Sequence, residues 1–167
     1  MKRAWLAALL IASTAHAHSA SDAYLTLTVG EAAAGGVIHG QWDIALRDLD
    51  FVLQLDDDGD GRLTWGEVRR HLADVERYAF AHLRVEAGTR GACTIKPTSR
   101  MIDGHADGTY AALFFDVLCP RAAAATLDYD MFFAIDPSHR GIVVIHGGND
   151  VATAVLSPQH RRIDLPR

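Results

Sequence analysis

Twelve consecutive residues read Asp56-Asp57-Asp58-Gly59-Asp60-Gly61-Arg62-Leu63-Thr64-Trp65-Gly66-Glu67. Side-chain oxygens stand at the first, third, fifth, ninth and twelfth places of this stretch. A hard cation such as Ca²⁺ takes about six to eight oxygen ligands, and the EF-hand loop supplies them from these places and from the carbonyl of the seventh residue. The sequence therefore predicts a calcium loop with these ligands: Asp56, Asp58, Asp60, the Arg62 carbonyl, Thr64 directly or through water, and Glu67.

The sixth and eighth places of the loop add to the match. Gly61 stands where the chain turns sharply with positive φ, which a residue without a Cβ adopts at no steric cost, and Leu63 is expected to point into the core. The alternative is a solvated acidic turn, because Asp-Gly pairs are common in hairpins. The number of constrained places that fit favours the calcium loop.

Helices are predicted on both sides of the loop. Residues 44–55 carry Leu46, Leu49 and Val52 at spacings of three, and residues 65–84 repeat apolar side chains at spacings of four, three, four and four. This period places the apolar residues on one face of a helix. We therefore expect an EF-hand helix-loop-helix unit over about residues 44–84. The apolar stripe of its second helix comprises Val68, Leu72, Val75, Ala79 and Leu83.

The start of the chain has the layout of a secretory signal peptide. Lys2 and Arg3 precede an apolar segment at residues 4–12, and small residues stand at Ala15 and Ala17. A membrane anchor is the alternative, but it would need about 20 predominantly apolar residues, and no later stretch is long enough either. We expect cleavage after Ala17, a periplasmic or secreted protein, and no transmembrane segment in the mature chain.

Removal of residues 1–17 leaves one expected domain, residues 18–167. The loss of Lys2 and Arg3 changes the formal charge from −5 to −7, and the apolar fraction of 49% suffices for a packed core. Nucleic acid is not expected as a partner, because its binding requires clustered Lys and Arg, and here basic residues adjoin only in short pairs such as Arg161-Arg162 near the end. We expect residues 161–167 to form a solvated tail.

The chain has two cysteines, Cys93 and Cys119. In an oxidising compartment an even count first indicates a disulfide bond, and the geometry permits it if the segments around Thr94 and Val117 pair as neighbouring strands. A redox or zinc site is disfavoured because there is no Cys-x-x-Cys sequence.

Outside the helix-loop-helix unit the apolar period changes to two. Strands are expected in segments separated by turns rich in Gly, Asp and Pro. Short strands at this spacing favour a sandwich. The predicted fold is α+β but mainly β, an antiparallel β-sandwich-like domain with one EF-hand insertion between its second and third strands. The predicted strands are residues 24–29, 37–44, 92–96, 100–102, 110–118, 127–135, 141–146 and 151–156, with Gly35-Gly36 turning between the first two.

Four segments follow the leader in a fixed order: His18-Ser19, Ser21-Asp22-Ala23-Tyr24-Leu25, Gly40-Gln41-Trp42-Asp43-Ile44-Ala45-Leu46-Arg47-Asp48-Leu49-Asp50, and residues 56–67. Their succession resembles the extracytoplasmic amino-terminal region of bacterial HupE/UreJ-type membrane proteins, over most of the chain after the leader. In that family a bundle of membrane helices, associated with nickel or cobalt permeases, follows the soluble region. The resemblance implies the compartment, the fold and the calcium loop, and a membrane protein as partner. A transport role does not carry over, because no such helices are predicted here.

The resemblance also raises a second metal hypothesis, a nickel-, cobalt- or copper-binding accessory protein of a membrane permease. Such a site favours imidazoles at short helical or strand spacing, and no two histidines after the leader lie three to five residues apart. We therefore expect surface histidines. The exception is His18, whose free amine and imidazole could chelate one ion together if cleavage follows Ala17; a frayed terminus is the alternative.

An enzyme is the third class considered. Asp103, His105 and Asp107, and likewise Asp136 and the adjacent Ser138-His139, place acid and imidazole groups close in sequence. Both clusters fall in predicted turns, where Asp and Ser are expected for backbone reasons. No nucleophile elbow, zinc-protease or phosphate-loop motif occurs, so a non-catalytic protein is expected.

The calcium loop has no second loop to pair with. Residues 103–114 come nearest, but Phe114 occupies the twelfth place, where a carboxylate is required. A lone EF-hand outside the cytoplasm is expected to use calcium mainly for structure rather than for signalling.

Overall fold

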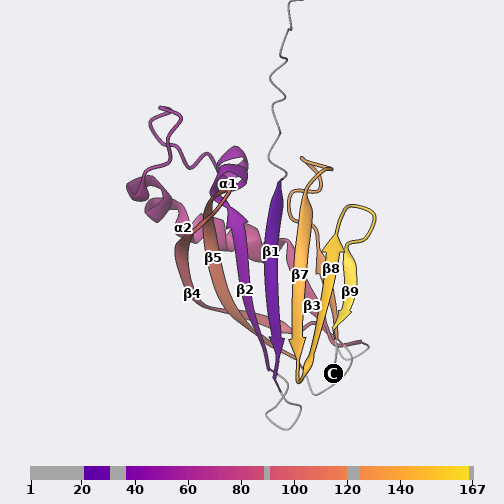
Figure 1. The fold of residues 1–167 in the computed structure, drawn as a ribbon. Coiled ribbons are helices and arrows are strands. Elements are labelled where there is room, and N and C mark those ends of the chain that lie inside the picture. Colours follow the sequence, from indigo (N-terminus) through magenta and orange to yellow (C-terminus); the bar gives the residue numbers. More distant parts are fainter. Residues whose placement is uncertain (1–20, 31–36, 89–90, 120–124, 166–167) are drawn as a thin grey trace, which may run out of the picture.

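The computed structural model describes residues 21–30, 37–88, 91–119 and 125–165 (Figure 1). The expected signal peptide at residues 1–17, His18 and the Gly35-Gly36 turn lie outside these ranges. Along the chain the elements are β1 (Asp22–Val29), β2 (Val37–Ala45), α1 (Leu46–Leu53), α2 (Trp65–Ala81), β3 (Leu83–Glu86), β4 (Thr94–His105), β5 (Gly108–Leu118), β6 (Ala125–Tyr129), β7 (Arg140–Gly147), β8 (Asp150–Leu156) and β9 (Arg162–Leu165).

The strands form two sheets. The larger has the order β4-β5-β2-β1-β7-β8, and the smaller has the order β3-β6-β9. Neighbouring strands are antiparallel except β1 and β7, which run parallel with Leu25 opposite Val143. The helix α2 lies across one face of the larger sheet (Figure 1). Along the chain, α1 and α2 follow β2 and precede β3. The protein is therefore mainly β, as expected, with two helices inserted after its second strand.

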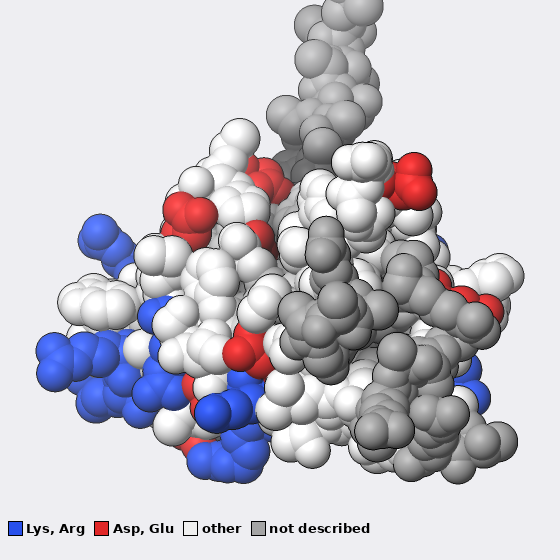
Figure 2. Space-filling model, turned by 90° about the horizontal axis from the view of Figure 1, so that it is seen from below, with Lys and Arg blue, Asp and Glu red and all other residues white. Residues whose placement is uncertain are grey.

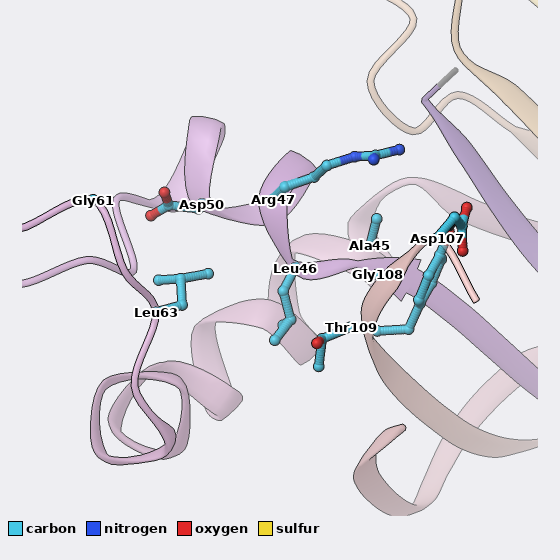
Figure 3. A pocket seen from close by; sticks show the side chains of 10 residues that line it. Ala45, Leu46, Arg47, Asp50, Gly61, Leu63, Asp107, Gly108 and Thr109 are labelled. Carbon is cyan, nitrogen blue, oxygen red and sulfur yellow. Dashed lines mark hydrogen bonds between the residues drawn. The ribbon is translucent and has the colours of Figure 1, made fainter. Parts of the chain in front are cut away.

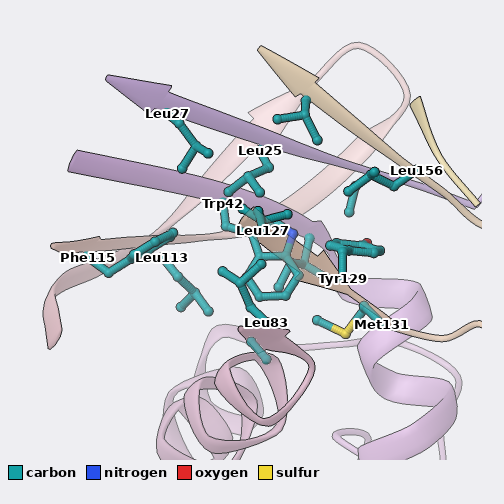
Figure 4. Close-up of a cluster of buried hydrophobic side chains, with 14 of the residues drawn as sticks. Leu25, Leu27, Trp42, Leu83, Leu113, Phe115, Leu127, Tyr129, Met131 and Leu156 are labelled. Carbon is teal, nitrogen blue, oxygen red and sulfur yellow. The ribbon is translucent and has the colours of Figure 1, made fainter. Parts of the chain in front are cut away.

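The core lies between the larger sheet and a second layer made of α2 and the smaller sheet. Strand alternation places Leu25 of β1, Trp42 of β2 and Leu113 of β5 on the same buried face, where they meet Leu83 and Tyr129 from the second layer (Figure 4). The rings of Trp42 and Tyr129 lie 5.5 Å apart, centroid to centroid. A two-layer fold of this kind buries one face of each element and positions α1 at one end of the larger sheet.

A glycine sets the spacing between β2 and the ring above it. Gly40 is buried, and a Cβ built on it would overlap the aromatic ring of Phe115, which stands opposite it on β5. Phe115 in turn packs edge-on against Phe80 of α2, with ring centroids 5.3 Å apart. The missing side chain thus lets an aromatic ring cross the strand under the helix.

Several predicted boundaries were wrong. The second helix ends at Ala81 rather than Arg84, because Leu83 and Val85 alternate inward in β3 and pair with β6. The strand expected over residues 127–135 ends at Tyr129, and Phe132 follows in a turn with φ of 59°. The segments 92–96 and 100–102 belong to one strand, β4, interrupted by a register shift between Pro97 and Ser99.

The expected solvated tail was also wrong over part of its length. Residues Arg162–Leu165 form β9 and pair with β6. The guanidinium of Arg162 donates to Asp128 Oδ2 at 2.6 Å, and Leu165 is buried. An ion pair and a buried leucine, neither of which alternation over so short a segment could reveal, stabilise this edge of the smaller sheet.

Candidate metal site

The loop begins at a capped helix end. Gln54 has a left-handed conformation, with φ of 53°, and its N–H donates to the carbonyl of Asp50 at 2.8 Å. The side chain of Asp50 then accepts the N–H of Asp56 at 3.0 Å. Since Leu49 and Leu55 are both fully buried, the start of the loop is fixed to the core on each side of this turn.

Three of the predicted ligands come together. One carboxylate oxygen from each of Asp56, Asp58 and Asp60 lies within 4.8 Å of the other two. Within the ranges that the structure describes, these residues form the one group of three or more acidic, histidine or cysteine side chains close enough to share an ion. Asp56 is half-buried, and the other two are exposed. Carboxylate oxygens are the ligands that Ca²⁺ prefers, so the group fits a hard cation in its chemistry.

Two glycines hold the first aspartate in place. The N–H of Gly59 donates to Asp56 Oδ1 at 2.9 Å, and the N–H of Gly61 donates to Asp56 Oδ2 at 2.8 Å. Both glycines have positive φ, 71° and 79°, a conformation that side chains disfavour. Asp58 and Asp60 each accept the N–H two residues further on, from Asp60 and Arg62, at 3.1 and 2.8 Å. The loop backbone therefore orients all three carboxylates before any ion is considered.

The last two predicted side-chain ligands contact each other instead. Thr64 caps α2 by accepting the N–H of Glu67, and its hydroxyl donates to Glu67 Oε2 at 2.7 Å. The same oxygen accepts the N–H of Thr64 at 2.8 Å, while Glu67 Oε1 accepts the N–H of Asp57 at 3.1 Å. Glu67 is only 3% exposed and is not part of the three-aspartate group. Its carboxylate links the two ends of the loop, because Oε1 accepts the N–H of Asp57 and Oε2 belongs to a capping box with Thr64.

The charges of the loop are unbalanced. The N–H of Asp60 lowers the pKa of Asp58, but repulsion from the Asp60 carboxylate, together with desolvation and the charge of Glu67, raises it overall. By contrast, hydrogen bonds from Thr64 and from the N–H of Asp57 lower the pKa of Glu67. Like charges so close together favour a bound cation or a proton.

Asp57 is the one acidic side chain of the loop that is not a predicted ligand, and it contacts α2 rather than the three-aspartate group. Asp57 Oδ2 accepts two hydrogen bonds from Arg70 of α2, at 2.6 and 2.8 Å, and Asp57 Oδ1 lies 2.8 Å from His71 Nε2. These bonds lower the pKa of Asp57 and raise the pKa of His71. Asp57, which stands at a non-ligand place of the loop, thus connects the outside of the loop to α2.

The loop faces the turn between β4 and β5 across a cleft of about 350 Å³ (Figure 3). Leu63 and Leu46 form its apolar side, and Asp50, Arg47 and Asp107 stand around its polar side. Leu63 is partly buried and packs against the core, which agrees with the expectation that the eighth loop residue points inward.

The histidines do not all lie at the surface, which corrects one expectation. His139 is fully buried, with its Nδ1 2.7 Å from Ser21 Oγ and its Nε2 2.7 Å from the hydroxyl of Tyr129. Ser21 Oγ donates to Asp48 Oδ2 at 2.9 Å. No local sequence pattern indicates this network, because its members come from segments up to 118 residues apart.

The predicted disulfide is confirmed. Cys93 and Cys119 are bonded, and Thr94 and Leu118 beside them stand opposite each other where β4 pairs with β5.

Basic side chains gather on one side of the face seen in Figure 2, with acidic side chains among them. On α2 and β4, Arg77 contacts Asp74 and Arg100 contacts Glu76, each at 2.7 Å. These contacts are surface ion pairs of the ordinary kind.

Neither α1 nor α2, the helices in the described part of the chain, is long and apolar enough to cross a membrane. No protein-family model and no curated protein matches the chain.

Proposed function

We propose that the protein is an exported, non-catalytic calcium-binding domain whose EF-hand loop, residues 56–67, holds one Ca²⁺ mainly for structure. The observation that carries this proposal is the group of three carboxylates within 4.8 Å, oriented by the N–H groups of two glycines with positive φ. Folding such a group without a counterion costs free energy through repulsion, which the raised pKa of Asp58 reflects.

The ligands would be Asp56, Asp58, Asp60, the Arg62 carbonyl, Thr64 and Glu67. A bound Ca²⁺ would offset the excess of negative charge in this loop, where five carboxylates accompany one arginine. Glu67 joins the ends of the loop by hydrogen bonds and would add its carboxylate as the last ligand. Thr64 already contacts Glu67 through its hydroxyl, which suits a ligand that acts through water. The bound ion would thereby connect the two ends of the loop, between α1 and α2, more firmly than the hydrogen bonds of Glu67 alone.

Export is part of the proposal and rests on two supports. The Cys93–Cys119 disulfide is typical of an oxidising compartment, and the leader at residues 1–17 has the composition of a signal peptide. Extracellular calcium modules commonly have dissociation constants of about 10⁻⁴ to 10⁻³ M, which suits a compartment where calcium is abundant. A membrane protein as partner, implied by the HupE/UreJ resemblance, belongs to the same proposal.

The test compares two substitutions in the loop by thermal unfolding with and without calcium. At calcium ten times the dissociation constant, binding to the folded state adds about 1.4 kcal/mol, or about 3 to 6 °C in Tm for a domain of this size. Glu67→Gln removes a charged ligand and should abolish most of that rise. Asp57→Asn is the matched control, because Asp57 contacts Arg70 and His71 outside the site, and it should retain most of the rise.

Equal loss in both variants, or no calcium response in the unmodified protein, would contradict the proposal. Nickel, cobalt and copper belong in the same assay, because the alternative accessory role rests on His18. Micromolar nickel binding that is lost on His18→Ala would favour the alternative.

A further inference from the structure

The strand β8 forms one edge of the larger sheet. It pairs with β7 on one side, and none of the described strands pairs with it on the other. Figure 1 draws β9 beside it, but β9 pairs with β6 in the smaller sheet. After Leu156 the chain turns through the Ser157–His160 bridge into β9, which belongs to the smaller sheet. The backbone of an edge strand offers unpaired N–H and C=O groups to another strand.

Little in β8 discourages such pairing. Its first residue, Asp150, carries a charge, but residues 151–156 read Val-Ala-Thr-Ala-Val-Leu, with no charge and no proline. Val151 and Val155 are 62% and 60% exposed. Natural edge strands usually carry Lys, Pro or a bulge that prevents association, so a bare apolar edge indicates a site of contact.

The first five of these residues, Val151-Ala152-Thr153-Ala154-Val155, read identically in both directions. An antiparallel pairing of two identical strands about a two-fold axis requires each residue to meet its mirror position. Centred on Thr153, such a pairing places Val151 opposite Val155 of the partner subunit, alanine opposite alanine, and Thr153 opposite Thr153 of the partner subunit. Paired β-branched residues and paired threonines are favourable across strands.

We propose that β8 is the contact by which two copies of this chain associate, antiparallel about a two-fold axis at Thr153, so that their larger sheets join into one. Val151, Thr153 and Val155 lie on the face that carries His146, Val144 and Ile142 of β7, because these residues stand opposite them in that order. Pairing in this register continues the partly apolar face of β7 across the junction. A slip of one residue would move every valine to the other face of the partner strand.

The opposite edge of the sheet explains why association would stop at two copies. There β4 carries Pro97, which has no N–H to donate, a register shift beside it, and the charges of Lys96 and Arg100. One edge open and the other blocked gives a closed dimer rather than a growing sheet.

Sedimentation of the purified protein over micromolar to millimolar concentrations tests the proposal. The unmodified protein should dimerise reversibly. Thr153→Lys and Thr153→Glu should each weaken the dimer by about tenfold or more, because each places two like charges opposite each other at the axis. An equimolar mixture of the two variants should form dimers again, since opposite charges then meet. Ser99→Lys, an exposed substitution on β4, is the matched control and should leave dimerisation unchanged.

Circular dichroism and Tm establish that each variant is folded before its mass is interpreted. A monomer throughout the concentration range would overturn the proposal. So would dimers that persist in Thr153→Lys, or a mixture that stays monomeric although both variants are folded, because the two-fold register requires Thr153 to meet itself.

Discussion

His139 shows how a single buried residue links distant segments. Because Ser21 Oγ donates to Asp48, it must accept from His139 Nδ1–H, which leaves Nε2 to accept from the Tyr129 hydroxyl. This order satisfies every member of the chain and requires a neutral imidazole. The network runs from α1 through the start of β1 to the end of β6. It therefore connects the first helix of the proposed EF-hand unit to the core.

Burial lowers the pKa of His139 to about 4, with the charge of Asp136 opposing the shift and that of Arg140 adding to it. In the unfolded chain a histidine titrates near pH 6.5. Between these values the unfolded state binds a proton that the folded state excludes, so the free energy of unfolding falls as the pH falls from about 6.5 to 4 and is fully retained above that window. The contribution is on the order of 3 kcal/mol.

Urea unfolding of the unmodified protein and of His139→Gln at several pH values measures this contribution. The variant should be less stable at neutral pH and should lose much of the slope between pH 4 and 6.5. His146→Gln, an exposed histidine on β7, controls for the loss of an imidazole. Equal slopes in the unmodified protein and His139→Gln would show that His139 does not govern the acid response.

The sequence could predict that the aspartates of the loop come together, but not the hydrogen bonds that Glu67 makes. Its spacing marks it as the twelfth loop residue, and the same spacing makes it the third residue of a helix capped by Thr64. Both roles satisfy the pattern. The structure shows the second, in which backbone N–H groups occupy the Glu67 oxygens.

Among the elements, the helices α1 and α2 and the longer strands were the most predictable, because each has a continuous period. β3 and β9 are four residues each and were missed. The parallel pairing of β1 with β7 joins segments more than 100 residues apart, which no local pattern reveals. The sequence predicts two strands where the structure has the single strand β4. Proline usually interrupts a strand, but an edge strand tolerates Pro97 at a register shift.

Packing between β2 and β5 gives a test at this scale. In Gly40→Ala the added methyl group would overlap the ring of Phe115, which is itself held under Phe80, so the substitution should destabilise the protein by about 1 to 3 kcal/mol. Gly104→Ala in β4 is the matched control, because a Cβ there meets no atom within 4 Å. Chemical denaturation measures both, and similar small effects would mean that β2 and β5 are not packed as closely as the structure has them.

For the whole molecule, the disulfide and the proposed calcium loop lie at opposite ends of the β4–β5 hairpin. The bond joins the outer ends of the two strands, and the hairpin turn contributes Asp107 and Gly108 to the cleft beside the loop. The strand β4, with 12 residues, extends over about 35 Å between the end that carries the disulfide and the hairpin turn. Their effects on the protein should therefore be independent.

Replacing both cysteines, Cys93→Ala with Cys119→Ala, removes a cross-link between positions 26 residues apart. The free energy of unfolding should fall by roughly 3 to 4 kcal/mol on the chain-entropy account. The calcium dissociation constant of the folded variant should stay within about twofold of the original value, because the loop is remote from the bond. A large loss of calcium affinity in a folded variant would contradict this independence.

Calorimetric titration of the purified, calcium-free protein with CaCl₂ measures the proposed site itself. We expect one calcium ion per chain with a dissociation constant of about 10⁻⁴ to 10⁻³ M or tighter, retained in Asp57→Asn and lost in Glu67→Gln. An absence of binding at millimolar calcium, or binding that Glu67→Gln leaves intact, would contradict it.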